Sequence, residues 1–276
     1  MVSLASDERS DERPPLDSAA LRSAVLRAET IWTSVDVVDS LGSSNATLAQ
    51  LALSGAAESG AVLLTEEQTT GRGRRGRGWV APKYSSVMMS VLVRPPVEQS
   101  RWGWLPLLTA LAVVDAVGAL GVQAGIKWPN DVLIAEAKLA GVLCEVVQTP
   151  EGPCVVAGCG INVHQSAGEL PSSAATSVFV AGGVADRELL AVEYLVAWER
   201  WFERWVANDP NVHTRYVERS STLGTEVQLD LPDGQVMRGT AMSLDRNGRL
   251  VICSDGVERA IAAADVVHLR PDHLPR

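Results

Sequence analysis

The pattern of apolar and polar positions divides the chain into a long part with helical and strand patterns and a short part rich in strands. Apolar residues at helical spacing predict helices over residues 16–27, 45–53 and 187–208, and a mostly apolar stretch that ends near Gly121 predicts a helix over residues 104–120. Continuous or alternating apolar runs predict strands over residues 31–39, 61–65, 87–93, 125–128, 131–134, 140–148 and 154–163. Because helices and strands do not alternate regularly, we expect an α+β fold, with a mixed β-sheet and flanking helices, rather than a doubly wound sheet.

The last part of the chain has short alternating strands over residues 225–230, 235–244, 249–254 and 257–261. They are separated by tight-turn sequences at Asp233–Gly234, Asn247–Gly248 and Asp255–Gly256. Such pairs favour hairpins, because Gly, Asn and Asp adopt positive φ angles more readily than other residues. The spacing predicts a small SH3-like β-barrel. We therefore expect a flexible tail over residues 1–15, a larger domain over 16–220 and a small β domain over 221–276.

The composition is that of an ordinary globular protein, with 46% hydrophobic and 21% charged residues among 276. A formal net charge of −9 disfavours binding to nucleic acid or to an anionic membrane, so a phosphorylated ligand would need a local basic site. The longest apolar run, over residues 105–120, contains Asp115 and is shorter than the ~20 residues that span a bilayer. Four cysteines without a CxxC pair favour a reduced, cytoplasmic protein without a cysteine metal site.

A segment rich in glycine and arginine, with the sequence EQTTGRGRRGRGW over residues 67–79, lies between two predicted strands. Glycine allows close backbone approach, and the arginine fork suits carboxylate and phosphate oxygens. Such a loop could hold two anions together, as when a carboxylate attacks a nucleotide α-phosphate. One alternative is a dinucleotide-binding fingerprint at Gly71, Gly73 and Gly76, although no helix is predicted to follow it. Another is an RNA-binding tether, which suits an acidic chain poorly.

A second cluster has the sequence KWPND over residues 127–131, and Lys138 follows seven residues after its end. A strand–turn–strand here would bring Lys127 and Asp131 close together. A lysine, an amide and a carboxylate together suit the binding of a nucleotide with Mg²⁺. The local composition alone favours a plainer alternative, a hairpin turn whose charges are solvated, with Lys138 as a surface lysine.

The third cluster has the sequence GCGIN over residues 158–162, inside an otherwise apolar strand. The glycines at positions 158 and 160 indicate either that a ligand or another backbone passes close to the strand, or that the strand has a bulge. No arrangement of Ser, Cys and His residues indicates a protein nucleophile.

Taken in order, these segments resemble the signature of the biotin protein ligases, with GRGRRGR over residues 71–77, KWPND over 127–131, KLAG over 138–141 and GCGIN over 158–162. Ser43–Ser44–Asn45 resembles the family's Ser-Thr-Asn element, with Ser44 where threonine is usual. The resemblance covers about residues 35–165, and the family also has a small C-terminal β domain. It implies a class II synthetase-like catalytic domain of the biotin/lipoate ligase type.

The resemblance also implies an activity and the residues for it. Such ligases use ATP and Mg²⁺ to convert biotin to biotinyl-5′-AMP and pyrophosphate, then transfer biotin to a lysine of a biotin carboxyl carrier domain in a carboxylase. The implied catalytic residues are Arg72, Lys127, Asp131 and Lys138. The implied biotin-binding residues are Ser43, Ser44, Asn45, Gln68, Gly71, Arg72, Gly73, Arg74, Lys138, Gly141, Gly158 and Gly160. The implied nucleotide-binding residues are Arg74, Arg77, Trp79, Lys127, Asn130, Asp131 and Asn162.

Two other functions remain as alternatives. The related lipoate protein ligases adenylate a different acid, but they differ in the arginine-rich loop. A non-catalytic nucleotide-binding module would bind ATP without turnover. Fewer than fifty residues precede Ser43, so we expect a stand-alone ligase without the N-terminal DNA-binding domain of some family members, and therefore no repressor role.

Overall fold

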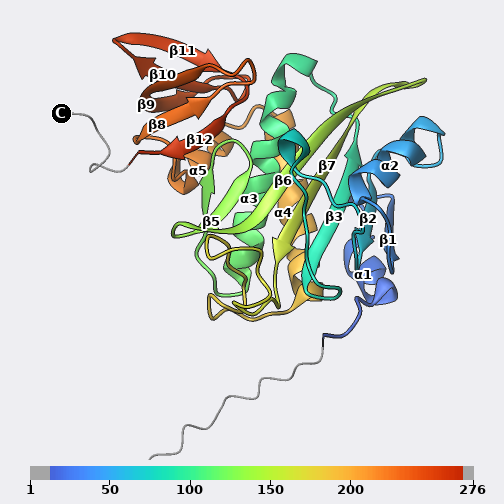
Figure 1. The fold of residues 1–276 in the computed structure, drawn as a ribbon. Helices are drawn as coiled ribbons and strands as arrows, with labels where there is room; N and C mark the ends of the chain where they lie inside the picture. The colour runs from blue at the N-terminus through green and yellow to red at the C-terminus, as the bar shows by residue number, and fades with distance from the viewer. Residues whose placement is uncertain (1–12, 270–276) are drawn as a thin grey trace, which may run out of the picture.

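The computed structural model describes residues 13–269 and contains a seven-stranded mixed sheet (Figure 1). The strand order is β1-β2-β3-β7-β6-β5-β4; β1 and β2 are parallel, and all other neighbours are antiparallel. The strands are β1 (Ser34–Val38), β2 (Ala61–Thr65), β3 (Ser86–Val93), β4 (Gly125–Lys127), β5 (Asp131–Ile134), β6 (Ala137–Thr149) and β7 (Gly152–Asn162). The predicted α+β fold with a mixed sheet is confirmed.

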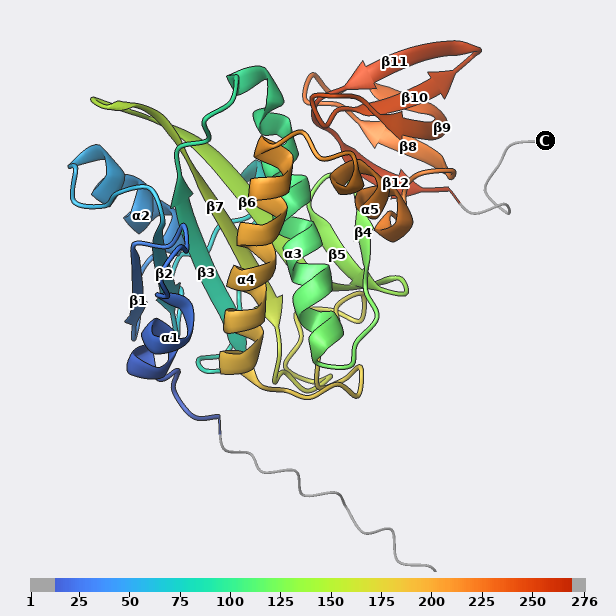
Figure 2. The same ribbon diagram turned by 180° about the vertical axis from the view of Figure 1, so that it is seen from behind.

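Helices pack on both faces of this sheet. They are α1 (Ser18–Val25), α2 (Ser44–Leu53), α3 (Leu105–Ala119), α4 (Arg187–Val206) and α5 (Asn211–Arg219). Figure 2 shows α1, α3 and α4 on one face, whereas α2 packs against β3, β6 and β7 from the other face. Strand alternation explains the division: Val62 and Leu64 belong to the core with α3 and α4, and Leu63 packs beneath α2.

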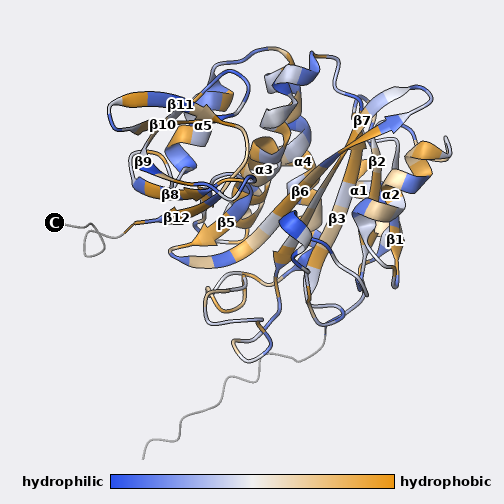
Figure 3. Ribbon diagram, turned by 45° about the horizontal axis from the view of Figure 1, so that its top comes forward, coloured by the Kyte–Doolittle hydropathy of each residue, from blue (hydrophilic) through white to orange (hydrophobic). Residues whose placement is uncertain are grey.

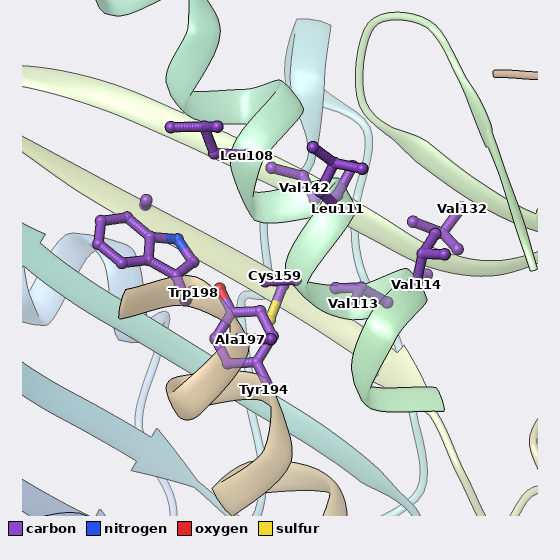
Figure 4. Packing of buried hydrophobic residues seen from close by; sticks show 14 of the residues in the cluster. Leu108, Leu111, Val113, Val114, Val132, Val142, Cys159, Tyr194, Ala197 and Trp198 are labelled. Atoms are coloured by element: carbon purple, nitrogen blue, oxygen red, sulfur yellow. The ribbon is translucent and has the colours of Figure 1, made fainter. Parts of the chain in front are cut away.

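The helix α3 is apolar on all sides because it is enclosed by other elements. Its residues Leu108, Leu111 and Val114 lie among side chains of β6, β7 and α4 (Figure 4). By length and composition the helical stretch Gln99–Ala119 could span a membrane, but 72% of its most apolar window is buried inside the protein. Figure 3 shows hydrophobic residues concentrated along the strands and hydrophilic residues in many connecting loops. The apolar run of α3 is therefore explained by its place in the core.

After α5 the chain forms a five-stranded antiparallel sheet in the order β11-β10-β9-β8-β12. Its strands are β8 (Glu226–Asp230), β9 (Val236–Leu244), β10 (Leu250–Ser254), β11 (Val257–Ile261) and β12 (Asp265–His268). The β9–β10 turn contacts the larger part of the chain: Trp104 Nε1 donates to Arg246 O at 3.1 Å, and Trp128 Nε1 donates to Gly248 O at 3.4 Å. The predicted small β domain is confirmed, while its SH3-like form and the limits 221–276 stay predictions.

Apart from two short 3₁₀ helices, the sequence pattern missed one α-helix, α5, and one strand, β12, and the predicted ends of the other α-helices and strands differ from the structure by at most three residues. Asp209–Pro210 does end the preceding helix, but proline is tolerated in the first turn of a helix, and Pro210 is the N-cap of α5. β12 has four residues, of which Val266 alone is buried, so its alternation is too short to recognise.

Part of the predicted tail contacts the body of the protein. Residues 1–12 lie outside the described residues. Arg13 forms an ion pair with Glu169 at 2.7 Å, and the hydrogen bonds from Arg13 and Ser166 lower the pKa of Glu169 to about 2. The backbone oxygen of Pro14 accepts a hydrogen bond from Arg187 Nη2 at 2.5 Å. The expectation of a flexible tail therefore does not hold for its last residues.

A buried ion pair joins the end of β2 to the start of α4. The side chains of Glu66 and Arg187 are each 3% exposed, and Arg187 Nη1 donates a hydrogen bond to Glu66 Oε2. Glu66 Oε1 also accepts from the backbone N–H of Leu16 at 2.5 Å. Since a buried charge is costly without its partner, this pair fixes the N-terminal segment, β2 and α4 to one another.

We expect Glu66→Gln to lower the free energy of unfolding by about 3–5 kcal/mol, because it leaves the buried guanidinium of Arg187 without its counter-charge. Asp36→Asn is the matched control. Asp36 pairs with Arg22 at 2.6 Å, but these side chains are 55% and 49% exposed, so the loss should be about 1 kcal/mol or less. Urea unfolding of both variants measures the difference. Equal losses would mean that burial gives the Glu66–Arg187 pair no special role.

Candidate active site

A cavity of about 130 Å³ lies on the sheet face that α2 covers. Three parts of the chain surround it: the start of α2, the glycine- and arginine-rich loop, and the exposed backbone of β6 and β7. Its lining residues are Ser43, Ser44, Asn45, Gln68, Arg72, Gly73, Arg74, Arg77, Gly78, Trp79, Asn130, Lys138, Gly141, Val142, Leu143, Gly158, Cys159 and Gly160. The cavity therefore brings together residues from all the motifs that the sequence indicates.

The floor of the cavity depends on two glycines in β7. A Cβ atom at Gly158 would lie 2.0 Å from Asn45 Oδ1, and one at Gly160 would lie 2.4 Å from the Trp79 ring. The pairing of β7 with β3 and β6 runs without a register shift here. The bulge alternative is therefore wrong, and the glycines allow side chains from two other segments to lie on the strand backbone.

The start of α2 forms one wall. Ser43 is the N-cap residue, whose hydroxyl accepts a hydrogen bond from the backbone N–H of Ala46 at 3.5 Å. Gln68 Oε1 accepts from the backbone N–H of Ser44 at 2.8 Å, and Ser90 Oγ lies 2.7 Å from Ser44 Oγ. This hydrogen-bond network fixes the polar groups that the helix presents to the cavity.

The glycine- and arginine-rich loop folds into a narrow hairpin. Arg72 and Gly78 form an antiparallel bridge, and Arg75 and Gly76 turn the chain with φ angles of 53° and 72°. Only a three-residue 3₁₀ turn, Arg74–Gly76, occurs in the loop. A dinucleotide fingerprint would open a longer helix at this point, so that alternative is wrong.

The loop arginines bind the C-terminal domain. Asp265 on β12 pairs with Arg75 Nη1 and with Arg77 Nη2, both at 3.0 Å. Arg75 Nη2 also donates to the backbone oxygen of Asp230 at 2.8 Å. Arg74 donates to Asn130 Oδ1 at 3.1 Å; burial lowers the pKa of this guanidinium, and the charge of Asp265 opposes that shift. The C-terminal domain thus holds the loop over the cavity.

The KWPND and KLAG segments meet through one ion pair. Lys127 and Asp131 are direct neighbours across the β4–β5 hairpin, as the sequence predicts. Lys138 Nζ lies 2.7 Å from Asp131 Oδ1 and next to Gly141. Asn130 Nδ2 donates to the backbone oxygen of Val142 at 2.9 Å. The alternative of a turn with solvated charges does not hold for Asp131, which pairs with a cavity-lining lysine.

Four residues that the resemblance implies do not line the cavity: Gly71, Lys127, Asp131 and Asn162. Lys127 lies close to His268 of the C-terminal domain. The pKa of His268 is lowered first by the burial of its own ring and then by the positive charge of Lys127. Asn162 is buried and donates to the backbone oxygen of Thr176 at 2.9 Å, while its Oδ1 accepts from Gln165 at 3.0 Å. In this structure Asn162 supports the end of β7.

Thiol chemistry has little support at this site. Burial raises the pKa of Cys144 and of Cys159 to about 12, so both thiols are protonated at neutral pH and are poor nucleophiles. Within residues 13–269, no group of three or more His, Cys, Asp and Glu side chains could hold a metal ion.

Three residues that complete the site are not among those predicted from the sequence. Glu145 accepts from Asn45 Nδ2 at 2.9 Å, Ser90 binds the start of α2, and Asp265 holds the loop. Ser90 carries a signal, because it is a polar residue inside the apolar strand β3 and is fully buried. Glu145 carries a weaker one, since it follows Gly141 at even spacing along β6. Asp265 lies on the strand that the sequence pattern did not reveal.

Comparison with known proteins gives the family of the chain. Residues 37–162 match the biotin/lipoate A/B protein ligase family, and residues 222–269 match the biotin protein ligase C-terminal domain. The fold is similar to the structure of a biotin protein ligase from Aquifex aeolicus in complex with biotin and ATP, with a TM-score of 0.74 and 24% identity. That comparison covers 87% of this chain and 100% of the other.

Two relatives are similar over most of the chain. A biotin–acetyl-CoA-carboxylase ligase from Mycobacterium tuberculosis is 41% identical over 268 residues, which cover 95% of this chain and 99% of the relative. The bifunctional ligase/repressor BirA of Bacillus subtilis is 30% identical over 87% of this chain and 76% of the relative. The ordered motifs, the two domains and the first of these relatives lead to one conclusion: the chain belongs to the biotin protein ligase family.

Proposed function

We propose that the chain activates biotin with ATP to biotinyl-5′-AMP and pyrophosphate, then transfers biotin to a lysine of a biotin carboxyl carrier domain. The observation that carries this proposal is the meeting of Lys138, Arg72 and the start of α2 at one cavity. The relative from M. tuberculosis, a biotin–acetyl-CoA-carboxylase ligase by name, supports a carboxylase of that type as the acceptor. It also favours biotin over lipoate as the acid.

The activation step needs fixed positive charge. The biotin carboxylate attacks the α-phosphorus of ATP, a carboxyl–phosphate bond forms, and pyrophosphate leaves. Negative charge grows on the phosphoryl oxygens, and preorganised cations lower that barrier. Lys138 lines the cavity from β6, and Arg72 and Arg74 line it from the loop. We assign the stabilisation of the phosphoryl charge to these three side chains.

Substrate recognition is assigned to the remaining lining residues. Ser43, Ser44, Asn45 and Gln68 present polar groups for the cyclic urea of biotin, beside the floor glycines. The indole of Trp79 lies on Gly160 and its Nε1 has no hydrogen-bond partner among the described residues. With Arg77 and Asn130, it would bind the nucleotide side of the adenylate.

In the transfer step, the amine of the acceptor lysine attacks the acyl carbon of biotinyl-AMP, and AMP leaves with the electrons of the broken carbon–oxygen bond. The amine loses its proton in this step, to solvent or to the phosphate of the departing AMP. Asp131 Oδ1 lies 2.7 Å from Lys138 Nζ, at the edge of the cavity where the amine must arrive. We therefore assign Asp131 to the orientation of Lys138 and of the incoming amine.

Magnesium would enter the reaction with ATP. Mg²⁺ usually keeps several waters and binds through one or two carboxylates together with substrate phosphates, and Asp131 beside the cavity fits such a carboxylate. A cytoplasmic location is supported by four free cysteines. The net charge of −9 supports the absence of DNA binding and of membrane binding.

We also propose that the C-terminal domain keeps the loop closed while the adenylate is present. A closed loop excludes water, which would otherwise hydrolyse the mixed anhydride. Asp265 contacts two of the four loop arginines between Arg72 and Arg77, so its carboxylate offsets their mutual repulsion. The domain division itself, residues 16–220 and 221–276, is part of this proposal.

The purified protein should catalyse ATP–pyrophosphate exchange that depends on biotin and not on lipoate. Incorporation of labelled pyrophosphate into ATP, with Mg²⁺ and either acid, measures this. Exchange with lipoate alone would place the chain with the lipoate ligases by activity. ATP binding without exchange in the presence of either acid would favour a non-catalytic nucleotide-binding module.

Lys138→Met should reduce the exchange rate by a factor on the order of 10²–10³, because one preorganised donor to the developing phosphoryl charge is lost. Lys83→Met is the matched control, since Lys83 pairs with Asp39 at 2.6 Å away from the cavity, and it should retain the activity of the wild type. Steady-state exchange kinetics on both folded variants give the comparison. A similar rate for Lys138→Met and wild type would remove Lys138 from the catalytic residues.

Asp265→Asn should loosen the loop. Each of its partly exposed ion pairs contributes about 1 kcal/mol at most, so the loss of both should speed tryptic cleavage between residues 72 and 77 about tenfold, since about 1.4 kcal/mol is a factor of ten. Timed digestion with mass spectrometry measures the rate. Asp255→Asn, in the β10–β11 turn, is the control and should be cleaved like wild type. Unchanged loop cleavage in Asp265→Asn would show that Asp265 does not hold the loop.

A further inference from the structure

Glu145 lies on the cavity side of β6, next to the site described above. Strand residues alternate between two faces: Gly141 and Leu143 line the cavity, and Val142, which also borders it, packs its side chain in the core on the other face. Glu145 follows at the same even spacing, with its side chain 35% exposed. The Glu145 carboxylate is therefore directed to the cavity side. The proposed reaction brings two other anions to that cavity, the carboxylate of biotin and the phosphates of ATP.

The Glu145 carboxylate contacts two walls of the cavity at once. Its Oε2 accepts a hydrogen bond from Asn45 Nδ2 at 2.9 Å, and it lies 3.6 Å from Arg72 Nη2. The second contact is long and its arginine is 49% exposed, so it is weak and easily exchanged for another anion. The hydrogen bond to Asn45 is the shorter contact and involves a largely buried partner.

This hydrogen bond helps to fix which way the Asn45 amide faces. Asn45 Nδ2 donates to Leu143 O at 3.0 Å and to Glu145, so both of its hydrogens are used. Asn45 Oδ1 accepts from Ser90 Oγ at 2.7 Å. In the reversed orientation, Oδ1 would face a carbonyl and a carboxylate, neither of which donates a hydrogen bond. The two acceptors near Nδ2 and the hydroxyl donor near Oδ1 therefore allow a single orientation of the Asn45 amide.

The fixed amide leaves Asn45 with one remaining capacity, an acceptor lone pair on Oδ1. That oxygen lies over the β7 backbone, where a Cβ atom at Gly158 would be 2.0 Å away. A ligand that meets Asn45 here must present an N–H group. The cyclic urea of biotin has two N–H groups and one carbonyl oxygen, so an acceptor in this place recognises one of its N–H groups.

We propose that Glu145 is a positioning residue for biotin: it holds the Asn45 amide with Oδ1 available to a urea N–H. This role rests on the proposed function, because it specifies how the same site recognises its acid. It acts through Asn45, and Glu145 itself does not take part in the chemistry.

The test compares Glu145→Leu with Glu145→Gln. The leucine variant removes the acceptor and leaves one Asn45 hydrogen unpaired, so the KM for biotin in the exchange assay should rise about tenfold, with the KM for ATP changed less than about twofold. The glutamine variant keeps an acceptor oxygen in the same place and should stay within about threefold of wild type. Glu145→Ala gives the same comparison if the leucine variant does not fold.

The control is Glu151→Leu, at the tip of the same β6–β7 hairpin, where Glu151 pairs with Arg94 at 3.1 Å and is 71% exposed. It should keep the wild-type KM for biotin. Adding Asn45→Ala to Glu145→Leu makes a double-mutant cycle. If Glu145 acts through Asn45, its loss should have almost no further effect in the Asn45→Ala background.

The outcomes separate this inference from the proposed function. Wild-type protein without biotin-dependent exchange would overturn the function itself. With an active wild type, an unchanged biotin KM in both Glu145→Leu and Glu145→Ala would overturn the positioning role. A tenfold rise that persists in the Asn45→Ala background would also overturn it, because Glu145 would then act by another route.

Discussion

The candidate site depends on a patch of bare backbone on one face of β6 and β7. Gly141 and Gly160 are direct partners across these strands, and Leu143 pairs with Gly158. With no Cβ atoms at the glycines, the Asn45 amide and the Trp79 ring lie directly on the sheet. The alternate residues of the same strands, such as Cys159, are fixed in the core beneath α3 and α4. The strands therefore cannot shift without disturbing both the site and the core.

The second constraint is charge. A chain with a net charge of −9 concentrates four arginines in one six-residue stretch, Arg72–Arg77, where like charges repel. Three of them are held by groups outside the loop: Asn130 Oδ1 binds Arg74, and Asp265 binds Arg75 and Arg77. Among the described residues, the side chain of Arg72 has only the long contact to Glu145. The arginine with the weakest protein contact is thus the one most free to bind an incoming carboxylate.

Much of the fold and the motifs of the site could be predicted from the sequence, because both follow local rules. A long apolar run located α3, apolar patterning located the central strands, and the turn pair Asn247–Gly248 located the β9–β10 hairpin. The partners of the motif residues could not be predicted, since Glu145 and Asp265 reach them through tertiary contacts that no local pattern encodes. Asn162 illustrates the reverse case: it belongs to a recognised motif, yet its amide is used within the protein, by Thr176 and Gln165.

The KWPND segment shows why the site and the placement of the C-terminal domain are coupled. Its Asn130 and Asp131 contact cavity residues, while Trp128 donates from its ring to Gly248 O and from its backbone to Thr222 Oγ1. One tight β4–β5 turn therefore contacts both parts of the chain. Since the C-terminal domain also binds the arginine loop, it meets the site from two directions. A movement of that domain away from Trp128 would withdraw support from the β4–β5 hairpin and the arginine loop together, so loop opening and domain displacement are expected to occur as one motion.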